Sequence, residues 1–401
     1  MKRLAMWVAA SAAAALVLAA CGGEDTVEES EDGAAQEEDT EEDDADGDAD
    51  SDAEAEADED ADEDVAATGP EPADVTYVTA AAVILPKEEV ATYAVPEALG
   101  FFEEEALNVD VVTADGSTAA IQAVASGSAD ITAADLGSLF AAVEQGVPVT
   151  GLGGLVVNWP WRIAVPADSD IQACADLAGS AIGIISLASG SNPFARSFVE
   201  ECGLDPDSDV DLIPVGLGPQ AAAALEGGEV DSLALFTQAY ANLELAGLDF
   251  RFLDNPDIFD PLVSLTWIVA NQALEESPEV IERFLRAANQ GLLFSNADPT
   301  EAMRISYDIL PDLLGDRSAE ERLEDDAFSL GTWLETTALE GPVESWGDFG
   351  GLTDTQLDAT MDFAISAGTV TEPFPTSDAF DPGLLPAAND FDNDAVLGLL
   401  P

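Results

Sequence analysis

The segment STAAIQAVASGSADITAADLGSLFAAVEQGVPVTGL, residues 117–152, shows how this chain is built. Ser117 and Thr118 stand where a helix cap is expected, and Gly127 marks the end of the helix that follows them. Two helices alternate with two short strands, and in chain order these elements are residues 119–125, 131–133, 137–145 and 147–152. Helices and strands that alternate in this way predict an α/β fold with largely parallel sheets.

The alternation continues on both sides of this segment. The further predicted strands are residues 75–78, 109–112, 162–165, 181–185, 210–215, 230–236 and 262–271. The further predicted helices are residues 96–107, 189–202, 220–225, 278–294, 302–310 and 354–366. The globular part is therefore expected to begin near residue 74.

A short motif occurs twice in this pattern. Residues 127–130 read GSAD and residues 228–231 read GEVD, and each stands between a predicted helix and a predicted strand. Together with the order of elements, the repeat indicates two lobes of one architecture.

The first residues have the pattern of an export signal. Lys2 and Arg3 precede an apolar run over residues 4–20, which is too short and too rich in alanine to favour a membrane-spanning helix. The run ends in LAAC, and a cysteine directly after small residues resembles the lipobox of bacterial lipoproteins. We therefore expect residues 1–20 to be a signal peptide and Cys21 to carry lipid. The alternative is a plain signal peptide with an incidental cysteine.

The charge of the chain is strongly negative, with a formal net charge of −71 and no histidine. Residues 24–64 hold 25 acidic residues and no basic one, so residues 21–73 are expected to form a disordered acidic tether, although a cation-binding or partner-binding tail is the alternative. The shortage of basic residues excludes a nucleic-acid binder, because phosphate recognition needs a basic face. It also suggests adaptation to high salt, where repulsion between the acidic groups is screened.

Cysteine and histidine usage narrows the chemistry. Cys174 and Cys202 form an even pair in an exported chain, which favours a disulfide over two buried thiols. The lack of histidine excludes Ser-His-Asp and Cys-His catalysis and histidine-bound metal, and we expect no metal or other cofactor. A pair of catalytic carboxylates is not excluded, but no spacing singles one out among so many acidic residues.

Five segments, in the right order over about residues 75–310, give the chain a family resemblance. They are residues 98–109 (ALGFFEEEALNV), 123–130 (AVASGSAD), 176–183 (DLAGSAIG), 202–206 (CGLDP) and 222–231 (AAALEGGEVD). The chain resembles substrate-binding proteins of ABC importers, in the group that includes nitrate, taurine and sulfonate binders and proteins similar to thiamine pyrimidine synthase. The resemblance implies a two-lobed, hinged fold of the periplasmic-binding-protein type (type II) with additional C-terminal helices, which closes on a solute. The division that it implies is residues 74–158 plus 262–345 for lobe 1, residues 159–261 for lobe 2, and residues 346–401 for a C-terminal helical segment that packs on the lobes. The hinge is then expected near residues 158–161 and 261–264.

The same resemblance implies a function. It suggests a lipid-anchored protein at the extracytoplasmic face of the cell membrane, acting as a monomer, that delivers a pyrimidine-like or sulfonate-, taurine- or nitrate-like solute to a permease and its ATPase. A solute sensor that signals to a membrane receptor is the alternative. An enzyme is not expected, because the pyrimidine-making relatives use a histidine and a pyridoxal phosphate lysine, whereas the only lysines here are Lys2 and Lys87.

Solute contacts are expected beyond the carboxyl ends of the strands, where helices begin. The candidates at such helix starts are Ser117, Thr118, Asp135, Ser138, Ser189, Gly190, Ser191 and Asn192. The candidate aromatic walls are Trp159, Trp161, Tyr240 and Trp267. The alternative is that each helix start is an ordinary cap and each aromatic is an ordinary core residue. Lys87, Arg162 and Arg196 are the only cations near plausible cleft positions, which favours a neutral or zwitterionic solute over an anion.

Overall fold

A computed structural model describes residues 69–187 and 189–401, all within one compact unit that spans Val65–Pro401. The predicted signal peptide, Cys21 and most of the predicted tether lie outside the described residues. Among the helices of the described part, none is long and apolar enough to cross a membrane.

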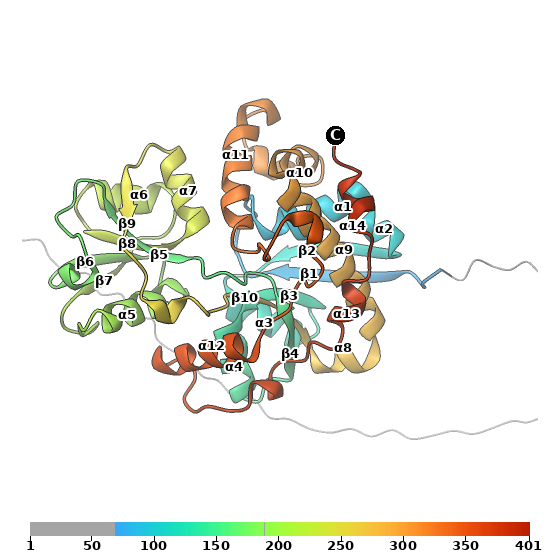
Figure 1. The fold of residues 1–401 in the computed structure, drawn as a ribbon, viewed down its shortest axis with the longest axis horizontal. Helices are drawn as coiled ribbons and strands as arrows, with labels where there is room; N and C mark the ends of the chain where they lie inside the picture. Colours follow the sequence, from blue (N-terminus) through green and yellow to red (C-terminus); the bar gives the residue numbers. More distant parts are fainter. Residues whose placement is uncertain (1–68, 188) are drawn as a thin grey trace, which may run out of the picture. The chain divides into compact units, whose positions relative to one another are not determined.

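The first sheet has five strands in the order β2-β1-β3-β10-β4 (Figure 1). Its strands are β1 (Ala73–Thr79), β2 (Leu107–Thr113), β3 (Ile131–Asp135), β4 (Val149–Gly154) and β10 (Leu265–Ala270). Strand β1 runs parallel to β2 and β3, whereas β10 runs antiparallel to both β3 and β4. The late segment that contains β10 therefore returns to the first sheet, as its sequence pattern suggested.

The second sheet repeats this plan in the order β7-β6-β8-β5-β9. Its strands are β5 (Trp161–Pro166), β6 (Ala181–Ile184), β7 (Asp211–Pro214), β8 (Ser232–Phe236) and β9 (Phe250–Phe252). Here β6 runs parallel to β7 and β8, and β5 is the antiparallel strand between β8 and β9. Each sheet thus has one antiparallel strand in the fourth position, which confirms the predicted two-lobed α/β architecture.

The repeated sequence motif has the same structural role in both sheets. The carboxylate of Asp130 accepts a hydrogen bond of 2.7 Å from the backbone N–H of Thr76, and the Asp130 N–H donates back to the Thr76 carbonyl. Asp231 makes the same pair of bonds with Ala181, and the carboxylate bond there is 2.8 Å long. Each aspartate therefore ties the start of its own following strand to a neighbouring strand, at the middle of β1 in the first sheet and at the start of β6 in the second.

Replacing either Asp130 or Asp231 by alanine is expected to lower the free energy of unfolding by about 1.5 kcal/mol, because a charge-assisted hydrogen bond is lost. Urea denaturation of both variants measures the effect. Asp110→Ala is the matched control, since the side chain of this exposed strand aspartate makes no hydrogen bond with a described residue and its loss only removes charge. Equal stability of all three variants would show that the repeated motif has no structural role.

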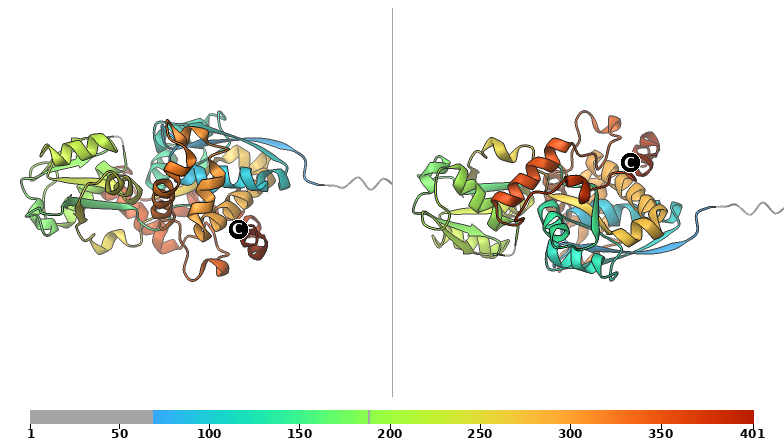
Figure 2. Two further views of the ribbon diagram at one scale, coloured as in Figure 1. Left: turned by 90° about the horizontal axis from the view of Figure 1, so that it is seen from above. Right: turned by 90° about the horizontal axis from the view of Figure 1, so that it is seen from below.

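Helices cover both faces of each sheet (Figure 2). They are α1 (Val95–Leu99), α2 (Phe101–Glu104), α3 (Ser117–Ala125), α4 (Leu136–Glu144), α5 (Ser191–Glu201), α6 (Pro219–Glu226), α7 (Thr237–Leu245), α8 (Asn271–Glu276), α9 (Pro278–Ala297), α10 (Pro299–Ser306), α11 (Ala319–Leu334), α12 (Asp354–Ser366), α13 (Leu385–Ala388) and α14 (Asn393–Leu397). A π-helical turn, η1 (Val90–Ala94), precedes α1. Alternate residues of each central strand enter different cores: Tyr77 packs toward α9, and Val78 packs toward α3 and α4.

Two C-terminal helices, α11 and α12, contact elements of both sheets. In α12, Leu357 and Met361 join the core between the first sheet and α4, whereas Phe363 packs on Trp159 at a ring distance of 5.3 Å. In α11, Ser329 accepts a 2.9 Å hydrogen bond from the side chain of Gln238 in α7. The predicted C-terminal helices are therefore present. The two crossing segments between the sheets are residues 155–160, between β4 and β5, and residues 253–264, between β9 and β10, and α12 packs on the first of them.

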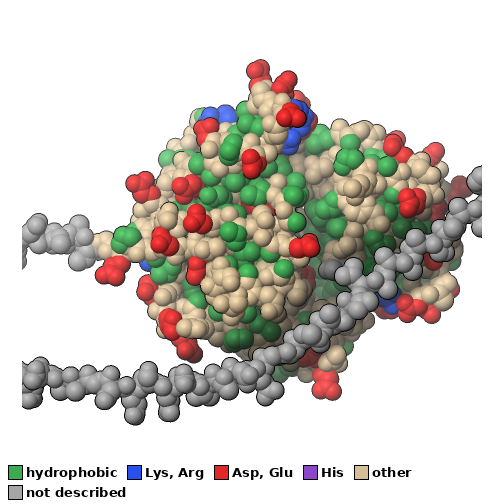
Figure 3. Space-filling view, turned by 180° about the vertical axis from the view of Figure 1, so that it is seen from behind, with side chains coloured by type: hydrophobic (Ala, Val, Ile, Leu, Met, Phe, Trp, Pro, Cys, Tyr) green, Lys and Arg blue, Asp and Glu red, His purple; other side chains and the backbone are tan. Residues whose placement is uncertain are grey.

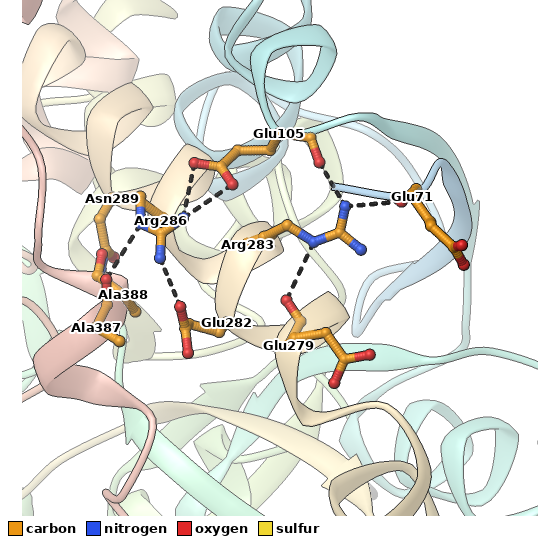
Figure 4. Close-up of polar contacts among 9 residues, drawn as sticks. All are labelled: Glu71, Glu105, Glu279, Glu282, Arg283, Arg286, Asn289, Ala387 and Ala388. Carbon is orange, nitrogen blue, oxygen red and sulfur yellow. Dashed lines mark hydrogen bonds and ion pairs between the residues drawn. The ribbon is translucent and has the colours of Figure 1, made fainter. Parts of the chain in front are cut away.

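Helix α9 holds a polar cluster that joins distant parts of the chain (Figure 4). The guanidinium of Arg283 donates to the carbonyls of Glu71 and Glu105, at 3.0 and 2.7 Å. Arg286 donates to both carboxylate oxygens of Glu105, at 2.9 Å each, and to the carbonyl of Ala387. The two arginines thereby fix the entry into β1 and the C-terminal segment to the first lobe.

Two sequence predictions differ from the structure in detail. The predicted helix over residues 96–107 is two short helices, because Gly100 adopts a left-handed conformation with φ of 80°. Gly116 caps α3, so Ser117 is its first helical residue and is not the cap.

The pair Cys174 and Cys202 forms a disulfide with Cα atoms 5.6 Å apart, which joins the turn before β6 to the end of α5.

Candidate functional site

The carboxyl ends of the parallel strands in both sheets lie next to the two crossing segments. The first crossing enters the second sheet at Trp161, which pairs with Phe236 at the end of β8. The return crossing enters the first sheet at Leu265, which pairs with Asp135 at the end of β3. The crossing segments therefore connect the carboxyl edge of one sheet with the carboxyl edge of the other. In open α/β folds solutes bind beyond such edges, so these edges form the candidate site.

On the first sheet, three of the predicted residues are brought together. Asp135 caps α4, and its carboxylate accepts bonds from the N–H and the hydroxyl of Ser138, at 2.9 and 3.3 Å. The hydroxyl of Ser117 accepts a 3.1 Å bond from the Asp135 N–H. Burial raises the pKa of Asp135, and the hydrogen bonds from Ser138 and Gly137 partly oppose this rise. Thr118, the neighbour of Ser117, is exposed to solvent.

On the second sheet, the loop after β6 folds back on itself. The hydroxyl of Ser191 accepts a 2.9 Å bond from the N–H of Ile185 and lies 2.5 Å from the hydroxyl of Ser189. The side-chain amide of Asn192 donates to the carbonyl of Leu187. Gly190 starts α5 without a side-chain cap, so the first N–H groups of this helix are not satisfied by a capping side chain.

The two predicted tryptophans of the crossing segment have different surroundings. Trp161 is half-buried, packs edge-on against Phe236, and lies over Gly190, where an added Cβ would come 2.9 Å from the indole. Trp159 stacks on Phe259 and contacts α12, and its indole N–H is buried without a partner among the described residues. Trp161 is therefore the better placed of the two to form a wall of the site.

Two predicted wall residues are core residues instead. Tyr240 is 1% exposed, and its hydroxyl donates to the Leu233 carbonyl and accepts from the Leu235 N–H. Burial raises the pKa of Tyr240. Trp267 is also 1% exposed and packs between the rings of Tyr77 and Phe284. The prediction that these two side chains contact the solute is wrong, because each ring lies inside a core.

A charged cluster is buried after β1, and only its lysine was among the predicted cleft residues. The ammonium of Lys87, a predicted cleft cation, contacts Glu88 and lies 3.0 Å from a carboxylate oxygen of Glu89. Glu89 is fully buried, its second oxygen has no partner among the described residues, and the hydroxyl of the buried Tyr77 is likewise unpaired. Burial, followed by the nearby carboxylate of Glu88, raises the pKa of Glu89 to about 7.

Apolar side chains are exposed in three loops at these edges. Val83 follows β1, Leu187 follows β6 and Leu217 follows β7, with exposed fractions of 60%, 68% and 37%. Acidic side chains are scattered over the face that Figure 3 shows, and few basic ones appear there. The surroundings of the edges therefore favour a solute with an apolar body.

Two surface hollows of the described part lie away from these polar groups. The larger one, of about 860 Å³, is lined by residues 347–352 and 382–390, and the other lies between α10 and α11. The larger hollow borders the end of β4, where its lining residue Leu352 packs on Gly154, but neither hollow gathers the polar groups described above. We therefore place the candidate site at the edges. In the described residues no group of three or more acidic or cysteine side chains is arranged to hold a metal ion.

The comparisons with known proteins agree with this architecture. A family model described as NMT1/THI5 like matches residues 87–302. A formylaminopyrimidine-binding protein of Halalkalibacterium halodurans is 28% identical over 51% of this chain and 62% of its own length. The riboflavin-binding protein RibY of Chloroflexus aurantiacus is 27% identical over 78% of this chain and 87% of its own length.

More distant similarities include an enzyme by name and a solved structure. A 4-amino-5-hydroxymethyl-2-methylpyrimidine phosphate synthase of Legionella pneumophila is 23% identical over 55% of this chain and 69% of its own length. The periplasmic aliphatic sulphonate binding protein SsuA of Escherichia coli has the same fold, with a TM-score of 0.57, 15% identity, and coverage of 77% of this chain and 92% of the other.

Proposed function

The chain belongs to the NMT1/THI5-like family, and from this premise we propose that it is the extracytoplasmic solute-binding component of an ABC importer. It captures a small solute between the carboxyl edges of its two sheets and delivers it to a permease. The observation that carries the proposal is the position of both crossing segments at the carboxyl edges, which lets the two lobes close on a solute.

The proposed solute is a nitrogen heterocycle such as a pyrimidine or a flavin. Two relatives are named for binding formylaminopyrimidine and riboflavin. The exposed apolar residues and the half-buried Trp161 at the edges suit a flat ring, because aromatic faces stack on one another. The absence of histidine removes one of the two groups on which the pyrimidine-making relatives rely, which supports binding over catalysis.

Mass spectrometry of small molecules that co-purify with the full-length chain tests this proposal. The chain is expected to carry a pyrimidine or a flavin, and calorimetric titration of the recovered compound is expected to give one site per chain. Turnover of that compound by the purified protein, or recovery of a peptide or a sugar in its place, would contradict the proposal.

Replacing Trp161 by alanine is expected to weaken binding of the recovered heterocycle about fivefold or more, because stacking of one ring on an aromatic side chain contributes about 1–3 kcal/mol. Calorimetry of the folded variant measures the loss. Phe328→Ala is the control, since Phe328 is a 43% exposed aromatic of α11 away from the strand edges. Unchanged affinity in the Trp161 variant would remove this residue from the site.

The proposal also covers the attachment of the protein. Cys21 carries the lipid that holds the receptor near its permease, and residues 21–73 set its reach as an acidic tether. Cys21→Ser is expected to release the protein from membranes into the medium, whereas Cys174→Ser is expected to leave its partition unchanged. Fractionation followed by immunoblotting measures both, and a membrane-bound Cys21→Ser protein would contradict lipid attachment at this residue.

Adaptation to high salt is the last part of the proposal. It rests on the formal net charge of −71, whose self-repulsion falls as salt shortens the Debye length to about 3 Å at 1 M. The melting temperature is therefore expected to rise with NaCl concentration, and a melting temperature that does not change with salt would contradict this part.

A further inference from the structure

Arg162 differs from every other cation of the described residues. Eight of the nine lysines and arginines there form a hydrogen bond or an ion pair, and several bind carboxylates. The guanidinium of Arg162 makes none with a described residue, although acidic residues outnumber basic ones by 82 to 11 in the whole chain. Arg162 is half-buried as a residue, and its charged group is left available to a ligand.

The position of Arg162 places it at the candidate site. It is the second residue of β5 and pairs with Leu235, one residue before the carboxyl end of β8. Its neighbour Trp161 packs on the α5 side of the sheet, so the alternation of side chains places Arg162 on the opposite side, the side that α7 covers. Arg162 therefore lies at the same edge of the sheet as the start of α7.

The start of α7 offers further unpaired polar atoms. The N–H of Thr237 donates to Pro160 at 2.9 Å, which holds the helix start against the first crossing segment. The Thr237 hydroxyl is buried without a partner. Gln238 is 1% exposed and donates to Ser329, but its amide oxygen has no partner. Because the Ser329 hydroxyl can donate or accept, the amide can also turn and present its NH₂ group.

An anion can accept hydrogen bonds from the donors in this set, and from the Gln238 amide only once it has turned. The positive end of the α7 dipole, the Thr237 hydroxyl and a guanidinium are each favourable for a carboxylate, sulfonate or phosphate oxygen. Phe236, which precedes α7, provides no side-chain cap that would compete with such a ligand for the first N–H groups.

We propose that Arg162 and the start of α7 form a subsite for an anionic group on the solute, so that the preferred solute is a heterocycle that carries a negative charge. This inference rests on the proposed function and narrows it. Hydrogen bonds that involve a charged group contribute about 1.5–3 kcal/mol, which corresponds to a preference of about tenfold or more for the anionic form.

Two matched pairs of probes test the inference by calorimetry on the full-length chain. They are riboflavin with riboflavin 5′-phosphate, and 4-amino-5-hydroxymethyl-2-methylpyrimidine with its phosphate. In at least one pair the phosphorylated member is expected to bind about tenfold more tightly or better. Arg162→Gln is expected to bring that ratio close to one while the affinity for the neutral member changes little. Arg196→Gln is the control, because Arg196, which the sequence placed near the cleft, instead pairs with the exposed Asp207 on the surface of the same lobe.

The outcomes separate this inference from the function on which it rests. Binding of a neutral member without a preference for its phosphate, or a preference that survives in Arg162→Gln, overturns the anion subsite alone. Failure of all four probes to bind overturns the assignment of a heterocyclic solute and the subsite with it. If Arg162→Gln does not fold, Thr237→Val gives the second measurement, and it is expected to lower the same ratio.

Discussion

Gly291→Ala is expected to destabilise the protein by at least about 3 kcal/mol, because it forces overpacking against the backbone. Gly291 lies where α9 crosses η1 and α1. A Cβ atom there would lie 2.2 Å from the carbonyl oxygen of Ala91 and 2.6 Å from the ring of Pro96. Neither group is the end of a flexible side chain, so the helices would have to separate.

The expected loss of stability in Gly291→Ala is opposite to the usual effect of replacing a helical glycine by alanine. In an exposed helix interior, a change from glycine to alanine stabilises by about 1 kcal/mol. Gly331→Ala is the matched control, since this glycine also lies within a helix, α11, and its added Cβ would come no closer than 3.9 Å to Pro299. Thermal and urea unfolding of the two variants are expected to give opposite signs. Equal stabilisation would show that α9 does not approach η1 so closely.

Glu89→Gln is expected to stabilise the protein at neutral and alkaline pH. The pKa of Glu89 is raised from 4.5 to about 7 in the folded protein by burial and by Glu88. Between these pH values the folded state holds a proton that the unfolded state has released. The stability of the natural protein therefore falls as the pH rises through this window, by up to about 3 kcal/mol for this group.

The glutamine variant lacks this titration, so its advantage is expected to grow from pH 4.5 to pH 7 and then remain constant. The free energy of unfolding measured at several pH values tests this. Glu144→Gln is the contrasting variant, because hydrogen bonds from Thr371 and Glu372 lower the pKa of this exposed carboxylate and give the opposite dependence on pH. A parallel pH profile for Glu89→Gln and the natural protein would show that Glu89 is not protonated in this window.

Much of the fold follows from local sequence signals. Helix α12 has the predicted bounds, Asp354–Ser366, because Thr353 and Gln356 form a capping box that marks its start. The twofold motif with Asp130 and Asp231 indicated two similar lobes, and both aspartates make the same bonds. The break at Gly100 was missed, since glycine tolerates both helical and left-handed conformations and the sequence does not distinguish them.

The site was harder to predict than the fold. Tyr240 and Trp267 stand near strand ends in the sequence, but which face a side chain occupies depends on how the helices pack, and both are in cores. Glu88 and Glu89 were overlooked because charged residues are seldom fully buried. The solute contacts of Ser117, Thr118, Asp135, Ser138, Trp159, Trp161 and residues 189–192 remain predictions.

The central claim is that one solute is held between the carboxyl edges of the two sheets. Hydrogen–deuterium exchange of the full-length chain, with and without its bound heterocycle, tests this claim most directly. We expect slower exchange in residues 80–89 and 135–138 of the first lobe, and also in residues 186–192 and 236–238 of the second. Protection confined to one lobe, or to the surface hollow lined by residues 347–352 and 382–390, would contradict it.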